Sequence, residues 1–228
     1  MAIVKKYKAT VENIRNPLAG IYTITFSSQK KFKYSPGQFL HLALDDYDGV
    51  GQWPESRCFS MQSNPNDEMV KITFATKGKY TQRMSEELLE KKIVWLKMPY
   101  GDIFQRGHVK NNCIFIAGGT GLTPFLSLFT DTSFKGYEKP VLYAGFKNKN
   151  FNIFDNELNL AKNINKEFQV NIICENQKGI LDINKIYQNQ KEATNYFISG
   201  PPIMIKNFRN YLLQKGIKEI NIVTDDWE

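Results

Sequence analysis

The chain has 228 residues with a formal net charge of +7, and 42% of its residues are apolar and 13% aromatic. This length suits two domains of about 100–120 residues each, and neither a membrane-spanning helix nor a signal peptide is expected, so the location is expected to be cytoplasmic. Three widely spaced cysteines and two histidines exclude a structural zinc site and a self-contained iron–sulfur cluster, so no metal is expected and redox chemistry would need an organic cofactor.

The positive charge is concentrated in the first half of the chain. Residues 1–106 carry 16 Lys and Arg against 11 Asp and Glu, a balance of +5, whereas residues 107–228 carry 14 against 12, a balance of +2. A basic half of this kind is suited to contact an acidic protein or a nucleic acid. The lysines are not gathered into a run with interleaved aromatics, so scattered solvated lysines explain the balance equally well, and a nucleic acid is not the expected partner.

Residues 1–108 have the pattern of a six-stranded antiparallel β-barrel. Short stretches of alternating or β-branched residues recur between breakers such as Asn16-Pro17 and Pro36-Gly37. A single helix is expected over Tyr80–Lys91, where apolar residues have helical spacing. The six expected strands are Tyr7–Ile14, Ile21–Ser27, Gln38–Leu44, Arg57–Gln62, Val70–Thr76 and Ile93–Met98.

Residues 109–228 alternate apolar strands with helices, which predicts an α/β domain with a parallel sheet covered on both faces. The expected strands are Cys113–Ala117, Pro140–Gly145, Gln169–Cys174, Tyr196–Ser199 and Ile220–Thr224. The expected helices are Pro124–Thr130, Phe154–Ile164, Ile183–Gln190 and Pro202–Lys215.

Two loops follow strands of this sheet, on the edge where open parallel sheets bind ligands. The first reads Gly118-Gly119-Thr120-Gly121-Leu122-Thr123-Pro124. Its glycines allow close approach to a bulky ligand, and Thr123 as N-cap with Pro124 as first helical residue would turn backbone amides toward a pyrophosphate. Pro124 stands where the dehydrogenase fingerprint G-x-G-x-x-G has its third glycine, so the ordinary dehydrogenase fold is disfavoured. The second loop, Ser199-Gly200-Pro201-Pro202, offers a hydroxyl suited to a nicotinamide ring, or is simply a good helix start.

In the first half, Arg57-Cys58-Phe59-Ser60 brings a cation, an aromatic ring and a hydroxyl together on one strand. Alternation sends Arg57 and Phe59 to one face and Cys58 and Ser60 to the other. Arginine is suited to a diphosphate, and an aromatic ring to a flat heterocycle. Gly78-Lys79-Tyr80-Thr81 begins the single helix, whose amides are suited to a second anion.

Taken together, these motifs resemble the ferredoxin–NADP reductase superfamily across essentially the whole chain. The R-x-[Y/F]-[S/T] motif of that family is similar to Arg57–Ser60, and its G-x-x-[S/T] phosphate loop to Gly78–Thr81. Its G-G-T-G-x-[T/A]-P loop is matched fully by Gly118–Pro124, and its C-G-P turn is similar to Ser199–Pro201. Its P-x-G-x-F turn is similar to Pro99–Phe104, with one residue more before the aromatic.

The resemblance implies a flavin-binding barrel over residues 1–108 and an NAD(P)-binding domain over 109–228, with FAD and NADH, or NADPH, as cofactors. It also implies that Ser60, near flavin N5, and Ser199, near the nicotinamide, are the catalytic residues. Two departures stand out: Phe59 replaces the commoner tyrosine and Ser199 the usual cysteine. The implied cofactor-binding residues are Arg57, Cys58, Phe59, Ser60, Gly78, Lys79, Tyr80, Thr81, Gly118, Gly119, Thr120, Gly121, Thr123, Pro124, Glu175, Gly200, Pro201 and Trp227. Of these, Cys58 is expected to pack ordinarily.

NADH is expected rather than NADPH. Cys174-Glu175-Asn176-Gln177 stands where NADP-using relatives carry a serine and an arginine, and a carboxylate repels a 2′-phosphate while accepting hydrogen bonds from a free ribose. The alternative is that Glu175 is an exposed loop acid and that Lys147, Lys149 and Lys178 bind the phosphate.

The function expected from the resemblance is hydride transfer from the nicotinamide to the flavin, followed by single-electron transfer to a ferredoxin, a flavodoxin or an oxygenase component. Trp227 is expected either to cover the flavin ring or to pack on the sheet edge. Two alternatives remain open: an electron-transfer subunit of a larger dehydrogenase, and a nonenzymatic nucleotide-sensing module with a basic binding surface.

Overall fold

The computed structural model describes residues 3–225. The chain divides into two compact units, Met1–Asp102 and Ile103–Glu228, here called unit 1 and unit 2. This division lies six residues before the expected junction at 108/109. The reason is that Ile103 is buried in the core of unit 2, and Phe104 packs against the same core. No helix within residues 3–225 is both long and apolar enough to cross a membrane.

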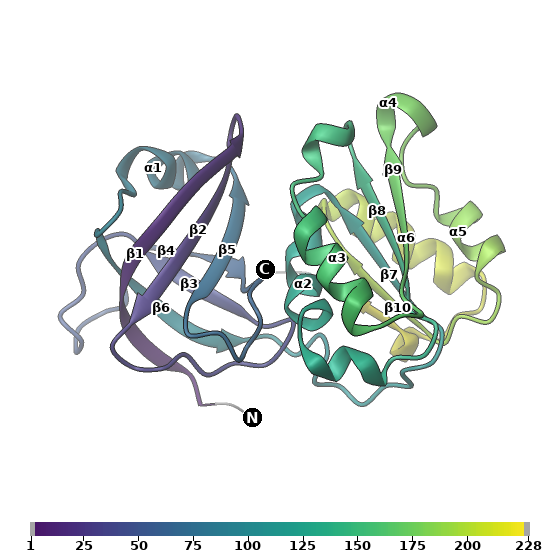
Figure 1. The fold of residues 1–228 in the computed structure, drawn as a ribbon, viewed down its shortest axis with the longest axis horizontal. Coiled ribbons are helices and arrows are strands. Elements are labelled where there is room, and N and C mark those ends of the chain that lie inside the picture. The colour runs from purple at the N-terminus through teal and green to yellow at the C-terminus, as the bar shows by residue number, and fades with distance from the viewer. Residues whose placement is uncertain (1–2, 226–228) are drawn as a thin grey trace. The chain divides into compact units, whose positions relative to one another are not determined.

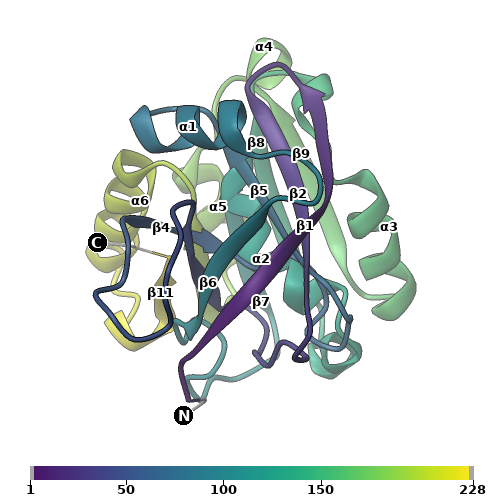
Figure 2. The same ribbon diagram turned by 90° about the vertical axis from the view of Figure 1, so that its left-hand side faces the viewer.

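Unit 1 is an antiparallel sheet of six strands in the order β4-β3-β6-β1-β2-β5 (Figure 1). Figure 2 shows two neighbours in this order, β6 and β1, from the side. Two residues after the edge strand β4, the Gln62 amide donates to the carbonyl of Lys71 in the other edge strand, β5, over 2.9 Å, which joins the two edges and closes the sheet. The predicted six-stranded antiparallel fold is therefore confirmed. The strands are β1 (Lys5–Leu18), β2 (Ile21–Ser28), β3 (Phe39–Ala43), β4 (Ser56–Ser60), β5 (Val70–Ala75) and β6 (Ile93–Tyr100).

The single helix of unit 1, α1 (Lys79–Glu87), packs over the inward-facing side chains of the strands. Its Tyr80 and Met84 are buried in the same core as Leu40, Leu42 and Leu96. The helix ends four residues before the predicted Lys91. The chain turns there because Lys91 takes a positive φ of 70° and its amide donates to the Val11 carbonyl of β1.

Unit 2 contains five parallel strands in the order β11-β10-β7-β8-β9. The strands are β7 (Cys113–Gly118), β8 (Val141–Phe146), β9 (Gln169–Cys174), β10 (Asn195–Ser199) and β11 (Ile222–Thr224). The helices are α2 (Thr123–Phe129), α3 (Asp155–Ile164), α4 (Glu175–Lys178), α5 (Ile183–Asn189) and α6 (Pro202–Gln214). The predicted parallel α/β fold is confirmed. The short α4 was not predicted, because four residues show no helical period.

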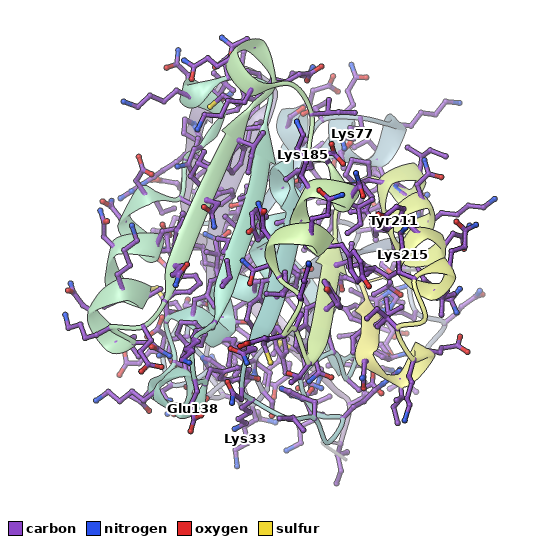
Figure 3. The ribbon with its side chains drawn as sticks, turned by 90° about the vertical axis from the view of Figure 1, so that its right-hand side faces the viewer. Lys33, Lys77, Glu138, Lys185, Tyr211 and Lys215 are labelled. Carbon is purple, nitrogen blue, oxygen red and sulfur yellow. The ribbon has the colours of Figure 1, made fainter. Side chains whose placement is uncertain are left out.

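Helices cover both faces of this sheet, α2 and α3 one face and α5 and α6 the other (Figures 1 and 3). Side chains of β7 alternate between the two faces, and each face has its own apolar core. Phe115 and Ala117 pack in the core under α2 and α3, whereas Ile114 and Ile116 pack in the core under α5 and α6. Since both faces are buried, the strand reads as a continuous apolar run. Tyr211 of α6 faces α5 (Figure 3), where its hydroxyl donates to Oδ1 of Asn184 over 2.5 Å.

The strand order reverses at β7, the first strand of unit 2. The chain proceeds from β7 through β8 to β9 on one side, and β10 and β11 then pair on the other side. In open parallel sheets, the crevice for ligands lies at such a reversal, beyond the carboxyl ends of the strands. The carboxyl ends of β7 and β10 are therefore the expected place for a ligand in unit 2.

Candidate functional site

The register of β4 places Arg57 and Phe59 on the core side of the sheet in unit 1. Arg57 pairs with Leu42 and Phe59 with Leu40, both fully buried, and directly opposed residues of an antiparallel pair share a face. Phe59 packs against this core, with its ring 5.9 Å from that of Phe74, and stays half-exposed. Its ring thus has one apolar side already supported and surface left for a ligand.

The Arg57 guanidinium lies over the Tyr80 ring, 5.0 Å from its centroid. The Tyr80 hydroxyl donates to the Leu42 carbonyl over 2.6 Å, which fixes the ring between β3 and the start of α1. Burial raises the pKa of Tyr80, so the ring is neutral. Arg57 also forms an ion pair with Glu55, but both side chains are more than half exposed, and such pairs stabilise weakly. The guanidinium therefore remains available to an anion.

The loop before α1 is held by the Thr81 hydroxyl, which accepts from the Lys77 amide over 2.9 Å and the Gly78 amide over 3.1 Å. Thr81 thus shapes the loop, and the amides at the start of α1 are the ones left without partners inside the helix. A Cβ on Gly78 would have no atom within 4 Å, so the space above the loop is open. Arg57 and this helix start lie together because Tyr80 contacts both.

The other face of β4 carries Cys58 and Ser60. The Cys58 sulfur lies 3.6 Å from Nε2 of His41, the residue that pairs with Cys58 on β3. Burial raises the pKa of the Cys58 thiol. Burial, and to a smaller extent the charge of Lys97, lowers the pKa of His41. Ser60 is half-exposed at the carboxyl end of β4, opposite Phe39. A neutral thiol against a neutral imidazole is ordinary packing rather than a reactive pair.

In unit 2, the glycine loop has a different form from the one predicted. Gly119–Leu122 forms a turn of 3₁₀ helix that continues into α2, so Thr123 is the first residue of α2 rather than its N-cap. The Thr123 hydroxyl donates back to the Thr120 carbonyl over 2.9 Å, and Pro124 is the second residue of the helix. The prediction of a Thr123 cap was wrong, because a 3₁₀ turn already supplies the helical start.

The glycine loop lies directly against the Ser199–Pro201 turn. A Cβ on Gly121 would stand 2.5 Å from Cα of Gly200 and 2.7 Å from the Ser199 carbonyl carbon. A Cβ on Gly118 would stand 2.8 Å from the Pro201 ring. Backbone thus packs on backbone between the carboxyl ends of β7 and β10, so the two loops form one surface at the reversal of strand order.

Ser199 has a buried partner that sequence reasoning missed. Its hydroxyl donates to Oδ2 of Asp225 over 2.9 Å, and the Asp225 amide donates to the Ile198 carbonyl over 2.9 Å. Ser199 is 2% exposed and Asp225 8%. Because the serine proton is engaged with the carboxylate, the serine oxygen has only its lone pairs left to offer, as a hydrogen-bond acceptor. Only the β10–β11 pairing brings these two residues together, so no local motif could reveal the contact.

Glu175 begins α4 immediately after β9, at the same carboxyl edge of the sheet, and is exposed. The Asn176 amide donates to the Lys147 carbonyl over 3.2 Å, which ties this turn to the end of β8. Leu181 closes over the end of β8, where a Cβ on Gly145 would stand 2.7 Å from it. The Glu175 turn is thus fixed at the far end of the edge that carries the glycine loop.

Trp227 lies outside the described residues. Its expected position over the flavin ring, and the alternative of packing on the sheet edge, both stay predictions.

Comparison with known proteins agrees with this arrangement. A family model described as "FAD-binding domain" matches residues 4–204. The chain is 23% identical to a phenol hydroxylase P5 protein of Acinetobacter pittii (strain PHEA-2), over 98% of this chain and 66% of that protein. It is 28% identical to the ferredoxin–NAD(P)(+) reductase component of a naphthalene 1,2-dioxygenase system of Pseudomonas putida, over 62% of this chain and 42% of that protein. The chain therefore spans less than two thirds of the length of these curated relatives.

Among solved structures, a ferredoxin NADP⁺ reductase from Neisseria gonorrhoeae with bound FAD and NADP superposes with a TM-score of 0.79. The match covers 99% of both chains at 16% sequence identity. The two proteins thus share one fold from end to end, and the resemblance inferred from the motifs is confirmed at the level of the fold.

Proposed function

Since the chain belongs to the family described as "FAD-binding domain", we propose that it is a flavin-dependent oxidoreductase that accepts hydride from NADH and passes electrons singly to a separate protein. One observation carries this proposal: a single chain holds two sites suited to nucleotides. In unit 1, the Arg57 guanidinium lies 5.0 Å from the Tyr80 ring at the start of α1. In unit 2, the glycine loop and the Ser199–Pro201 turn meet where the strand order reverses.

The residues of unit 1 fit FAD. Arg57 and the start of α1 are two groups that attract anions, brought to one place by Tyr80, which suits a diphosphate better than a single phosphate. Phe59 offers a supported ring to the flat isoalloxazine, and Ser60 offers a hydroxyl for a ring heteroatom. When bound, FAD supplies the conversion of a two-electron hydride into single-electron steps.

The residues of unit 2 would position NADH. The contact between Gly121 and Gly200 lets the dinucleotide approach backbone at the ends of β7 and β10. Ser199, with its proton held by Asp225, would accept a hydrogen bond from the nicotinamide carboxamide. The contribution of the protein is position rather than proton transfer, because hydride transfer needs no general acid or base.

The test of the proposed function is the visible spectrum of the purified protein before and after anaerobic NADH. We expect flavin absorption bands that bleach when NADH is added, and FAD after acid extraction and chromatography. A colourless protein that added flavin cannot reconstitute would contradict the proposal, and FMN alone would contradict the choice of cofactor. Gel filtration of native extract tests whether the chain works inside a larger dehydrogenase.

Replacing Arg57 by alanine should weaken FAD binding by about 1.5–3 kcal/mol, because a charge-assisted hydrogen bond to the diphosphate is lost. Fluorescence titration of the apoprotein with FAD measures the change. Arg15→Ala serves as the matched control, since Arg15 is an exposed arginine of the same unit outside the site. Equal FAD affinity in both variants would show that the diphosphate lies elsewhere.

The wild-type protein should prefer NADH over NADPH at least tenfold in kcat/KM, because the Glu175 carboxylate repels a 2′-phosphate. Glu175→Gln should narrow that ratio by raising kcat/KM for NADPH. Glu192→Gln, a change at an exposed acid between α5 and β10, should leave the ratio unchanged. A tenfold preference for NADPH in the wild type would refute this assignment and point to Lys147, Lys149 and Lys178.

A further inference from the structure

The Glu55 carboxylate occupies the cation that the proposed function assigns to the FAD diphosphate. Nη2 of Arg57 donates to Oε1 of Glu55 over 2.8 Å, and the two groups form an ion pair. Nη1 of Arg57 donates to the Ser56 carbonyl over 2.9 Å. Both terminal nitrogens of the guanidinium are therefore engaged, one of them by a negative charge. A phosphate oxygen would need the same donors.

The fold keeps the Glu55 carboxylate close to Arg57. The Tyr80 hydroxyl lies 3.3 Å from the Glu55 carbonyl and donates to it, and the Arg57 guanidinium lies over the ring of the same tyrosine. On the next residue, the Ser56 hydroxyl accepts from the Trp53 indole over 3.0 Å. Glu55 also stands two positions before Arg57, a spacing that turns both side chains to one face of an extended chain. This is the face where the proposed function puts FAD.

The other carboxylate near Tyr80 is engaged elsewhere. Burial raises the pKa of Tyr80, with smaller contributions from the charges of Asp45 and Glu55. Asp45 accepts from Nη2 of Arg83 over 2.8 Å, and Nε of Arg83 donates to Glu87 over 2.7 Å. The charge of Asp45 is thus matched by a second arginine, whereas the charge of Glu55 is matched by Arg57 itself.

The pair between Glu55 and Arg57 contributes little to the stability of unit 1. The side chains of Glu55 and Arg57 are 55% and 53% exposed, and ion pairs in water at this level of exposure are weak. A weak pair can be broken by a stronger anion. It still lowers the affinity for that anion, because the pair must be given up when the anion binds.

We propose that Glu55 is an internal competitor for FAD: in the flavin-free protein its carboxylate holds the Arg57 guanidinium, and the diphosphate must displace it. The inference rests on the proposed function, which assigns Arg57 to the diphosphate. Displacement makes the affinity for FAD lower than the contacts of Arg57 alone would give. Glu55 thereby sets how readily the protein gains and releases its flavin.

The test is a double-mutant cycle on the binding of FAD to the flavin-free full-length protein. Glu55→Gln keeps the size of the side chain and one acceptor oxygen, but removes the charge. The cycle compares the wild type, Glu55→Gln, Arg57→Ala and the double variant by fluorescence titration with FAD. Glu68→Gln is the matched control, since Glu68 is an exposed acid of unit 1 in the loop between β4 and β5.

Glu55→Gln should lower the dissociation constant of FAD by about two- to fivefold, as expected when an exposed ion pair no longer competes. Glu68→Gln should leave it unchanged. In the Arg57→Ala background, Glu55→Gln should have no effect, because the pair is already gone. An unchanged or higher dissociation constant in Glu55→Gln would mean that Glu55 only positions Arg57, and would overturn the proposal. An equal gain with and without Arg57 would also overturn it, since the carboxylate would then act by repulsion alone.

Inorganic pyrophosphate tests Glu55 without a flavin. The Nε–H signal of Arg57 is followed by NMR while the flavin-free wild type and Glu55→Gln are titrated with pyrophosphate. The Arg57 signal should shift in both proteins, at pyrophosphate concentrations about two- to fivefold lower in Glu55→Gln. Failure of every variant to bind FAD would count against the proposed function alone, because this titration still reports on the pair. An Arg57 signal that does not move, or that moves equally in both proteins, would overturn the competition.

Discussion

Gly121→Ala should weaken the binding of NADH at least 100-fold, about 2.7 kcal/mol, while FAD binding is retained. The new Cβ would stand 2.5 Å from Cα of Gly200, 2.6 Å from its nitrogen and 2.7 Å from the Ser199 carbonyl carbon. These are backbone atoms at the end of a buried strand, so no side chain can rotate away to relieve the overlap. The loops must separate, and the surface proposed for the dinucleotide is lost.

Titration of the FAD-loaded protein with NAD⁺ and with NADH under anaerobic conditions measures this effect. Gly107→Ala is the matched control: Gly107 also lies in unit 2, does not have a positive φ, and would have no atom within 4 Å of its Cβ. The Gly107→Ala variant should bind NADH with the same affinity as the wild type. If Gly121→Ala bound NADH normally, the ligand could not lie on the joined loops of β7 and β10.

Phe115→Ala should lower the free energy of unfolding of unit 2 by about 3–5 kcal/mol. Phe115 stands in the middle of β7 with no exposed surface. Its ring centroid lies 5.0 Å from that of Phe129, 5.1 Å from Phe197 and 5.5 Å from Phe125. Removing the ring leaves a cavity enclosed by other rings that cannot all move inward, so both burial and packing are lost.

Urea unfolding followed by circular dichroism gives this value, with flavin fluorescence as a separate signal for unit 1. Leu160→Ala provides the comparison, because Leu160 lies on α3 with 47% of its surface exposed. Replacing the Leu160 side chain by alanine should change the free energy of unfolding by less than about 0.5 kcal/mol. A loss below 1 kcal/mol for Phe115→Ala would mean that the ring cluster closes readily around a missing member.

Features set by local periodicity were predictable from the sequence. Alternation along Arg57–Ser60 predicts two faces, and the register shows Arg57 and Phe59 on the core side and Cys58 against His41. The apolar run Cys113–Ala117 likewise predicts a strand buried on both faces, and β7 occupies those residues. Period and side-chain type are sufficient in such cases because the pattern repeats within a few residues.

Features that depend on pairing between distant segments were not predictable. Asp225 follows β11 and meets Ser199 only because β11 pairs with β10. Arg57 lies over the Tyr80 ring only because the pairing of β4 with β3 sets Arg57 opposite Leu42, whose carbonyl holds the Tyr80 hydroxyl. The prediction that Thr123 caps α2 was wrong for a related reason, since the preceding residues already form a 3₁₀ turn. Such contacts are fixed by the fold as a whole rather than by any local pattern.

The alternation of β7 also determines where the chain tolerates a change of length. One residue inserted within Cys113–Gly118 would turn every later side chain of the strand to the opposite face. With an insertion before Phe115, this ring would point at α5 and α6, which cover Ile114 and Ile116 in the native fold. The helices on each face would then meet side chains of the wrong size. Lys191 and Glu192, which are exposed between α5 and β10, carry no such alternation. Homologous chains should therefore vary in length there and keep β7 at constant length.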